Sequence, residues 1–130
     1  MRTTSVIALG AIGQIAVNAH DLDRAVGFYR DTLGMTFLFQ VPGMAFFDCG
    51  GVRLMVGLAS EPAFDHPASV IYYRVDDIRA AHRTLAERNV EFTTPPHHVA
   101  KLPDHDLWLA FFRDTEGNTL ALMSEVRTAA

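Results

Sequence analysis

The sequence predicts an α+β protein made of two successive β-α-β-β-β modules. A capped helix occurs twice, 56 residues apart, and a hairpin that begins with two phenylalanines occurs twice, 65 to 66 residues apart. The chain has 130 residues, of which 49% are hydrophobic and 20% charged, as is typical of one globular domain. We expect a single domain over 1–130, with module 1 at about 12–58, a linker at 59–69 and module 2 at about 70–126.

Each module is expected to place a helix after its first strand. In module 1, Asp21 suits the N-cap because its carboxylate can accept from the free N–H groups of the first turn. Apolar residues then recur at helical spacing until Gly34, a residue typical of helix ends. In module 2, either Asp76 or Asp77 takes the cap position and Asn89 closes the helix.

The last two strands of each module form the second repeat. The segment "MAFFDCGGVRLMV" matches "LAFFRDTEGNTLAL", so that Phe46 corresponds to Phe111 and Leu54 to Leu120. Module 2 also carries "PPHHVAKLPDHDLW" where module 1 has only "QVPG". Two neighbouring prolines and several turn residues predict that this insertion is an irregular loop.

Composition and charge exclude several classes of protein. A net charge of −4 provides no basic surface for nucleic acid, and no apolar run reaches the ~18 residues that a membrane span needs. The single cysteine, Cys49, cannot form an internal disulfide, which fits a reducing compartment. We therefore expect a cytoplasmic protein that binds neither nucleic acid nor a membrane.

The doubled module resembles the vicinal oxygen chelate superfamily, which includes glyoxalase I, extradiol dioxygenases and bleomycin-binding proteins. The resemblance rests on "DLDRAVGFYRDTLG" after the first strand and "FFRDTEGN" before the last, and it covers roughly residues 12 to 126. It implies cupped mixed sheets around a cavity. It also implies a homodimer, since members of the family commonly pair their halves across two chains and open sheet edges favour being covered.

The resemblance further implies four strand positions that bring ligands to one divalent ion. By position these fall on Gln14, Met55, Val70 and Ala121, and metal-binding relatives typically carry glutamate at the last. Gln14 can offer an amide oxygen, but valine and alanine cannot bind a metal and a thioether is a poor ligand for hard ions. We expect no metal at this site and no cofactor.

The insertion in module 2 is the other candidate for chemistry. It contains His97, His98 and His105, which could act as acid or base catalysts or, together with Asp104 and Asp106, hold an unusual metal. Adjacent His97 and His98 point apart if the chain is extended, so at most one of them joins a given site. The alternative is an exposed polar connection. We expect the insertion to border the cavity as part of a lid.

Alternation along the strands predicts which other residues line the cavity. Arg53 and Arg74 could each grip a carboxylate or phosphate on a ligand, and Trp108 is either a stacking surface or part of the core. The expected ligand-binding residues are Gln14, Asn18, Arg53, Met55, Val70, Tyr72, Arg74, Trp108 and Ala121.

These residues favour a glyoxalase-like or bleomycin-resistance-like protein that binds a small hydrophobic or aromatic molecule without the usual metal. The alternative is an enzyme of the isomerase, lyase or dioxygenase type that uses His97, His98 or His105, with or without metal. A third possibility is a module that binds a partner and no small ligand. Whether the protein is catalytic is left open by the sequence.

Overall fold

The computed structural model describes residues 7–127, which form two β-α-β-β-β modules. Module 1 contains β1 (Gln14–Asn18), α1 (Leu22–Gly27) with a π-helical turn (Phe28–Thr32), β2 (Thr36–Val41), β3 (Met44–Cys49) and β4 (Val52–Gly57). Module 2 contains β5 (Ile71–Arg74), α2 (Ile78–Glu87), β6 (Phe92–Lys101), β7 (His105–Arg113) and β8 (Thr119–Arg127). A short 3-10 helix, Pro62–Phe64, lies between them. The predicted α+β class is confirmed.

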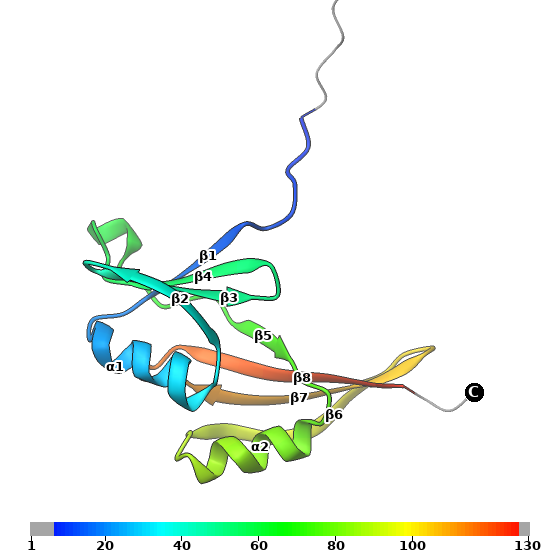
Figure 1. Ribbon diagram of the computed structural model, residues 1–130. Coiled ribbons are helices and arrows are strands. Elements are labelled where there is room, and N and C mark those ends of the chain that lie inside the picture. Colours follow the sequence, from blue (N-terminus) through cyan, green and yellow to red (C-terminus); the bar gives the residue numbers. More distant parts are fainter. Residues whose placement is uncertain (1–6, 128–130) are drawn as a thin grey trace, which may run out of the picture.

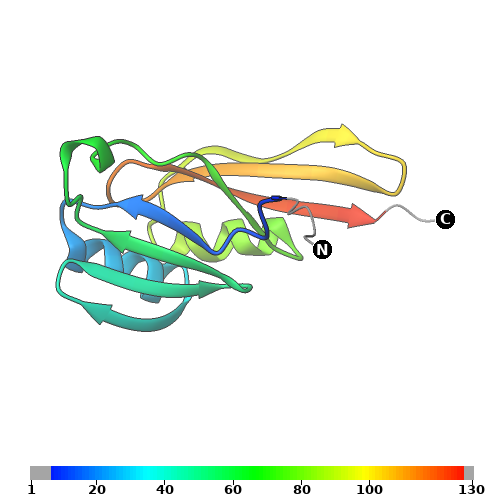
Figure 2. The same ribbon diagram turned by 90° about the horizontal axis from the view of Figure 1, so that it is seen from above.

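Each module folds into its own open, four-stranded mixed sheet. The strand orders are β1-β4-β3-β2 and β5-β8-β7-β6, so the repeat in the sequence is also a repeat in topology. The first strand of each module runs parallel to the last, and the other neighbours are antiparallel. Each helix lies below its own sheet in Figure 1, and Figure 2 shows the two sheets side by side from above. The opposite face of each sheet is called its outer face below.

The helices begin and end where the sequence predicts. The Asp21 carboxylate accepts from the N–H of Arg24 at 3.2 Å, and the Asp77 carboxylate accepts from the N–H of Ala80 at 3.1 Å. Gly34 and Asn89 follow the two helices in the left-handed conformation, with φ of 72° and 65°. Because asparagine is one of the few side chains that tolerate this conformation, Asn89 can close α2 as Gly34 closes the π-helical turn after α1.

The two modules share one hydrophobic core on the helix side of the sheets. Tyr29 from the π-helical turn after α1 and Phe47 from β3 are fully buried there, with ring centroids 6.1 Å apart. Module 2 contributes Phe112 from β7 and Leu120 from β8 to the same cluster. Since successive strand residues point to opposite faces, the neighbours of these core residues, including Met55 and Ala121, point to the outer faces.

The insertion in module 2 is a long β-hairpin, so the prediction of an irregular loop is wrong. β6 and β7 pair across it, with Ala100 opposite Leu107 and irregularities in register between Thr94 and Ala100. β6 is an edge strand, where proline is tolerated because one side of the strand needs no ladder hydrogen bond. In Figure 1 the hairpin, drawn in yellow, projects away from module 1.

Within residues 7–127, the helices are too short and too polar for any of them to traverse a lipid bilayer.

Candidate functional site

The outer face of the first sheet brings together several of the predicted ligand-binding residues. Gln14 lies opposite Arg53 in the register of β1 and β4, and Ala16 lies opposite Met55. The Nε of Arg53 donates to the Oε1 of Gln14 at 2.8 Å, and the Nε2 of Gln14 lies 3.8 Å from the Met55 sulfur. The amide of Gln14 is thus engaged on both sides by its neighbours on the sheet.

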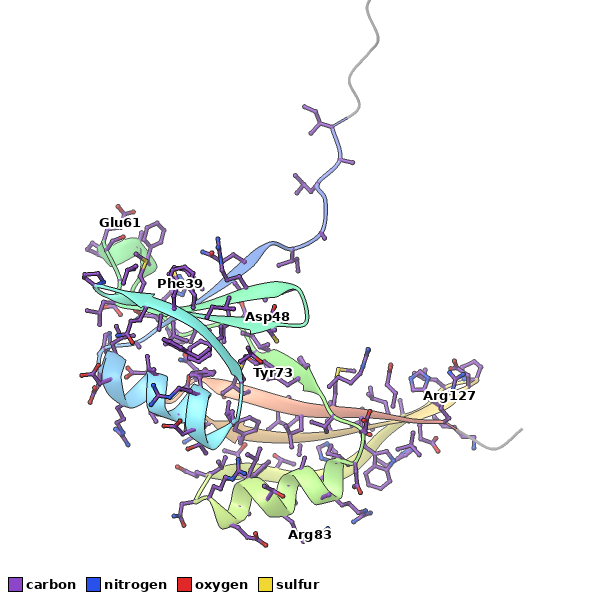
Figure 3. All side chains as sticks on the ribbon, in the orientation of Figure 1. Phe39, Asp48, Glu61, Tyr73, Arg83 and Arg127 are labelled. Atoms are coloured by element: carbon purple, nitrogen blue, oxygen red, sulfur yellow. The ribbon has the colours of Figure 1, made fainter. Side chains whose placement is uncertain are left out.

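Aromatic side chains extend this surface toward β2. Phe39 and Phe46 are stacked with ring centroids 4.6 Å apart and an interplanar angle of 27°. The guanidinium carbon of Arg53 lies 5.3 Å from the centroid of the Phe46 ring, a distance at which a cation is attracted to the ring face. Phe39 is labelled on the first sheet in Figure 3. Phe39 is not among the residues that the sequence predicted for the site, because the irregular register of β2 hides its alternation.

On the outer face of the second sheet, two aromatic rings cover Ala121, the position at which metal-binding relatives typically carry glutamate. Ala121 lies between Tyr72 on β5 and Phe111 on β7 in the sheet register. The Tyr72 and Phe111 rings approach edge to face with centroids 6.0 Å apart, and Ala121 is 0% exposed. Strands two apart in a sheet are ~9.5 Å from each other, so the rings lean together over the small alanine.

These residues do not fit the divalent ion that the fold family implies. Val70 precedes β5, and neither it nor Ala121 carries a donor atom. The Gln14 amide oxygen already accepts from Arg53, and the remaining donor, the Met55 thioether, is soft. Within residues 7–127 there is no group of three or more histidine, cysteine, aspartate or glutamate side chains placed to hold a metal ion.

A cavity of about 290 Å³ lies between the outer face of the first sheet and the linker. Its wall includes Asn18, Met44, Met55, Leu58, Phe64 and His66. The backbone of Gly57, also in this wall, is approached so closely that a Cβ there would meet the Gly43 carbonyl oxygen at 3.1 Å. Asn18 and Met55 were predicted for this site from the alternation of their strands. The linker residues were not, since an irregular segment has no periodicity that assigns its side chains to a face.

Polar contacts hold the linker against this cavity. The Oδ1 of Asp65 accepts from the Nδ2 of Asn18 at 2.7 Å and lies 2.7 Å from the Nε2 of His20. This hydrogen bond and the Asp65 charge raise the pKa of His20, while contacts with His20 and Asn18 lower the pKa of Asp65. The Oδ1 of Asn18 is buried and has no hydrogen-bond partner among the described residues.

A second cavity of about 410 Å³ lies on the helix side, between α2 and the residues that follow α1. Leu33, Met35, Leu85 and Phe112 contribute to its wall, together with Tyr73, whose hydroxyl is buried and has no partner among the described residues. Burial raises the pKa of the Tyr73 hydroxyl. Figure 3 places Tyr73 between the two sheets. Of the predicted site residues only Arg74 reaches this wall, so this larger cavity is separate from the predicted site.

The three predicted catalytic histidines are distributed over both faces of the β6–β7 hairpin. His97 pairs with Leu109, and its ring lies 6.3 Å from that of Phe111 on the outer face. Its Nδ1 lies 2.9 Å from the carbonyl oxygen of Pro95. Since a carbonyl only accepts, Nδ1 carries the proton and a neutral His97 has its lone pair on Nε2.

His105 is held between two carboxylates on the outer face. Its Nδ1 lies 2.7 Å from Asp104 and its Nε2 lies 3.3 Å from Glu125, and its side chain is 15% exposed. Glu125 also pairs with Arg74 at 3.2 Å. Because Asp104 contacts Nδ1, and Nε2 is buried without a hydrogen-bond partner among the described residues, His105 has no nitrogen available to a substrate.

His98 and Trp108 lie on the other face of the hairpin. They are partners in the register, their rings are 5.6 Å apart, and His98 pairs with Asp106 at 3.2 Å. The guanidinium of Arg79 on α2 lies 5.1 Å from the Trp108 ring, and Trp108 packs against the core. Of the two roles predicted for Trp108, a place in the core is confirmed and a place in the cavity with Ala121 is not, because the alternation of β7 turns the ring toward α2.

The fold and the positions described above define the class of protein. The chain belongs to the Glyoxalase/Bleomycin resistance protein/Dioxygenase superfamily, whose family model matches residues 11–122. It is 30% identical over 127 residues to a "Glyoxylase-like domain-containing protein" of Didymella fabae, covering 87% of this chain and 92% of that protein.

Two solved structures share its fold over nearly their whole length. One is a glyoxalase/bleomycin resistance protein/dioxygenase from Nocardioides, with a TM-score of 0.71, 25% identity, and coverage of 95% of this chain and 89% of that chain. The other is lactoylglutathione lyase from Agrobacterium tumefaciens, with a TM-score of 0.72, 21% identity, and coverage of 90% and 95%.

Proposed function

We propose that this chain binds a small apolar or aromatic molecule in the cavity between the first sheet and the linker, without a divalent metal. The observation that carries the proposal is the composition of the cavity wall. Met44, Met55 and Phe64 supply apolar surface, while the Asn18 side chain, held by its hydrogen bond to Asp65, contributes a fixed polar group. Mostly apolar walls with a few fixed polar groups are typical of small-molecule sites.

The methionines suit ligands that vary in shape. A thioether side chain has several rotatable bonds and a polarizable sulfur, so it adapts to aromatic surfaces better than a branched side chain does. Met44 and Met55 lie on the adjacent strands β3 and β4 and contribute to the same wall. This pair favours an aromatic ligand over a strongly polar one.

A thermal-shift screen with small aromatic compounds tests the proposal. A ligand that binds only the folded state raises Tm by an amount that grows with its concentration relative to Kd. Ala16→Phe fills the cavity from its exposed wall, and we expect it to abolish the shift. Ala63→Phe adds the same ring at an exposed position beside the cavity and should keep the shift. Equal shifts in both variants would contradict this site.

The second candidate function is an enzyme that uses His97 as a base. The observation in its favour is the hydrogen bond to Pro95, which leaves the lone pair of a neutral His97 on Nε2, on the same face as Phe111. An imidazole of this kind can remove a proton from a bound carbon acid.

Hydrogen exchange separates the two functions. Ligands found in the thermal-shift screen are incubated with the protein in D₂O, and loss of a carbon-bound proton is followed by NMR. If His97 is the base, His97→Gln abolishes the exchange and His98→Gln, on the opposite face, preserves it. If no bound ligand exchanges, the chain is a binding protein only.

We also infer that the chain works as a homodimer in the cytoplasm. Phe39 and Tyr72 leave 45% and 48% of their surfaces exposed on the outer faces of the two sheets, and a second copy could cover them. The single cysteine, Cys49, supports a reducing compartment.

A further inference from the structure

Arg53 does not form the ion pair that its place in the sheet offers. It lies directly opposite Asp48 in the register of β3 and β4. The Asp48 carboxylate instead accepts from the N–H of Gly51 in the hairpin turn at 3.2 Å. The Arg53 side chain turns the other way, toward Gln14 on β1. No carboxylate of residues 7–127 lies within 4.0 Å of its guanidinium nitrogens.

The guanidinium of Arg53 is held in one orientation by neutral groups. The Gln14 amide oxygen accepts from its Nε at 2.8 Å, and the Phe46 ring supports it from one side at 5.3 Å. Its Nη1 and Nη2 donate to no acceptor in the described part of the chain. A planar guanidinium with its outer edge available is suited to bind a carboxylate through two parallel hydrogen bonds.

Arg53 lies next to the wall of the cavity in which the ligand is proposed to bind. It precedes Met55 by two residues on β4 and shares its face, so the two side chains leave the strand ~6.5 Å apart. Met55 and Ala16 form the cavity wall at this end, and Gln14 contacts both Arg53 and Met55. A molecule whose rings fill the cavity can therefore extend an acidic group to Arg53.

We propose that Arg53, positioned by Gln14 and Phe46, is an anion subsite that makes this protein specific for aromatic monocarboxylates. The proposal rests on the proposed function, because the cavity holds the ligand's rings. We expect the ligand to carry one negative charge. One guanidinium faces the ligand here, and the neighbouring Asp48 carboxylate disfavours further negative charge. Arg74, the other arginine predicted to bind a ligand, is already paired with Glu125.

A matched pair of probes tests the subsite. 2-Naphthoate and 2-naphthamide have the same rings and nearly the same shape, but only the first carries a charge. Their Kd values are measured by isothermal titration calorimetry at low and high salt. We expect naphthoate to bind at least tenfold more tightly at low salt, equivalent to about 1.4 kcal/mol, and this preference to shrink as salt screens the charge.

Variants assign the preference to Arg53. Arg53→Gln should reduce the ratio of the two Kd values to near one, and Gln14→Leu should reduce it in part, because Arg53 loses the acceptor that orients it. Asp48→Asn should increase the ratio. Arg83→Gln removes the same charge from the solvent-exposed side of α2 and should leave the ratio unchanged (Figure 3).

The outcomes separate the subsite from the cavity. If both probes bind with equal affinity, or if Arg53→Gln retains the preference, the anion subsite is overturned and the cavity stands. If neither probe binds, both the proposed function and the subsite are overturned for this class of ligand.

Discussion

At the scale of single residues, Ala121 and Met55 lie at strand positions where a hard divalent ion would need better ligands. The sequence predicted that the two strand positions of the usual metal site in module 2 offer no ligand, since the side chains of valine and alanine have no donor atom. It did not predict that Tyr72 and Phe111 would meet over Ala121, because that contact depends on the register of three strands. A small residue here is therefore also a packing requirement, since any longer side chain must displace the two rings.

Ala121→Glu tests this requirement. A buried glutamate would separate the Tyr72 and Phe111 rings and lose its hydration, so we expect the free energy of unfolding to fall by about 3 kcal/mol. Urea unfolding measures the change. Ala63→Glu, at an exposed position, should remain within about 0.5 kcal/mol of the parent. Added zinc or nickel should not restore the loss, and stabilisation by either ion would show that the site can still be completed.

At the scale of elements, the turn between β7 and β8 fastens module 2 to the helix of module 1. The Oδ2 of Asp114 accepts from the Tyr29 hydroxyl at 2.7 Å and from the Asn118 side chain at 3.0 Å. Its Oδ1 accepts from the N–H groups of Glu116 and Asn118, both at 2.9 Å. The segment "FFRDTEGN" predicted a turn before a strand. The partner across 85 residues, Tyr29, could not be predicted, because no local pattern specifies a long-range contact.

Asp114→Ala should be among the most damaging substitutions in the chain. It leaves the Tyr29 hydroxyl and three N–H donors without their acceptor, and we expect a loss of about 3 kcal/mol or more in the free energy of unfolding. Tyr29→Phe removes only one of these donors and should cost about 1 kcal/mol. Denaturant unfolding of both variants checks the order, and an equal cost for the two would show that the backbone hydrogen bonds to Asp114 contribute little.

The linker offers a prediction about pH. Asp65 raises the pKa of His20, so this pair stabilises the fold fully below about pH 6.5 and its contribution is lost as pH rises through the folded pKa. The lowered pKa of Asp65 extends the contribution toward acid until that carboxylate is protonated. Glu116, 3.7 Å from the His20 ring, and the nearby His66 face the same pair.

We expect His20→Gln to flatten the fall in urea midpoint above about pH 6.5. His82→Gln, whose ring packs edge to face on Phe92, should retain that fall. An unchanged pH profile in His20→Gln would show that the linker contact does not contribute to stability.

At the scale of the whole molecule, the repeat predicted the architecture better than it predicted the site. The strand, helix and hairpin of each module follow from periodicity and capping, which are local. The site depends on where the linker lies and on which face each hairpin residue takes. The "PPHHVAKLPDHDLW" segment was predicted as an irregular loop but forms most of a β-hairpin. Its prolines would interrupt an internal strand, but they are tolerated in the edge strand β6. Neither of the two cavities described above has both Met55 and Ala121 in its wall.

The proposed homodimer, in which a second copy covers the exposed rings beside the cavity, can be measured. We expect sedimentation at micromolar concentration to give a species of about twice 14.4 kDa. Val70, just before β5, is 42% exposed, and by alternation it shares the face of Tyr72. Val70→Asp should therefore yield the monomer by placing a charge in the apolar contact. Val126 is similarly exposed, at 46%, but alternation along β8 turns it away from the outer face. Val126→Asp should therefore remain a dimer. A parent protein that sediments only at 14.4 kDa would contradict this assembly, as would a Val126→Asp variant that dissociates while Val70→Asp does not.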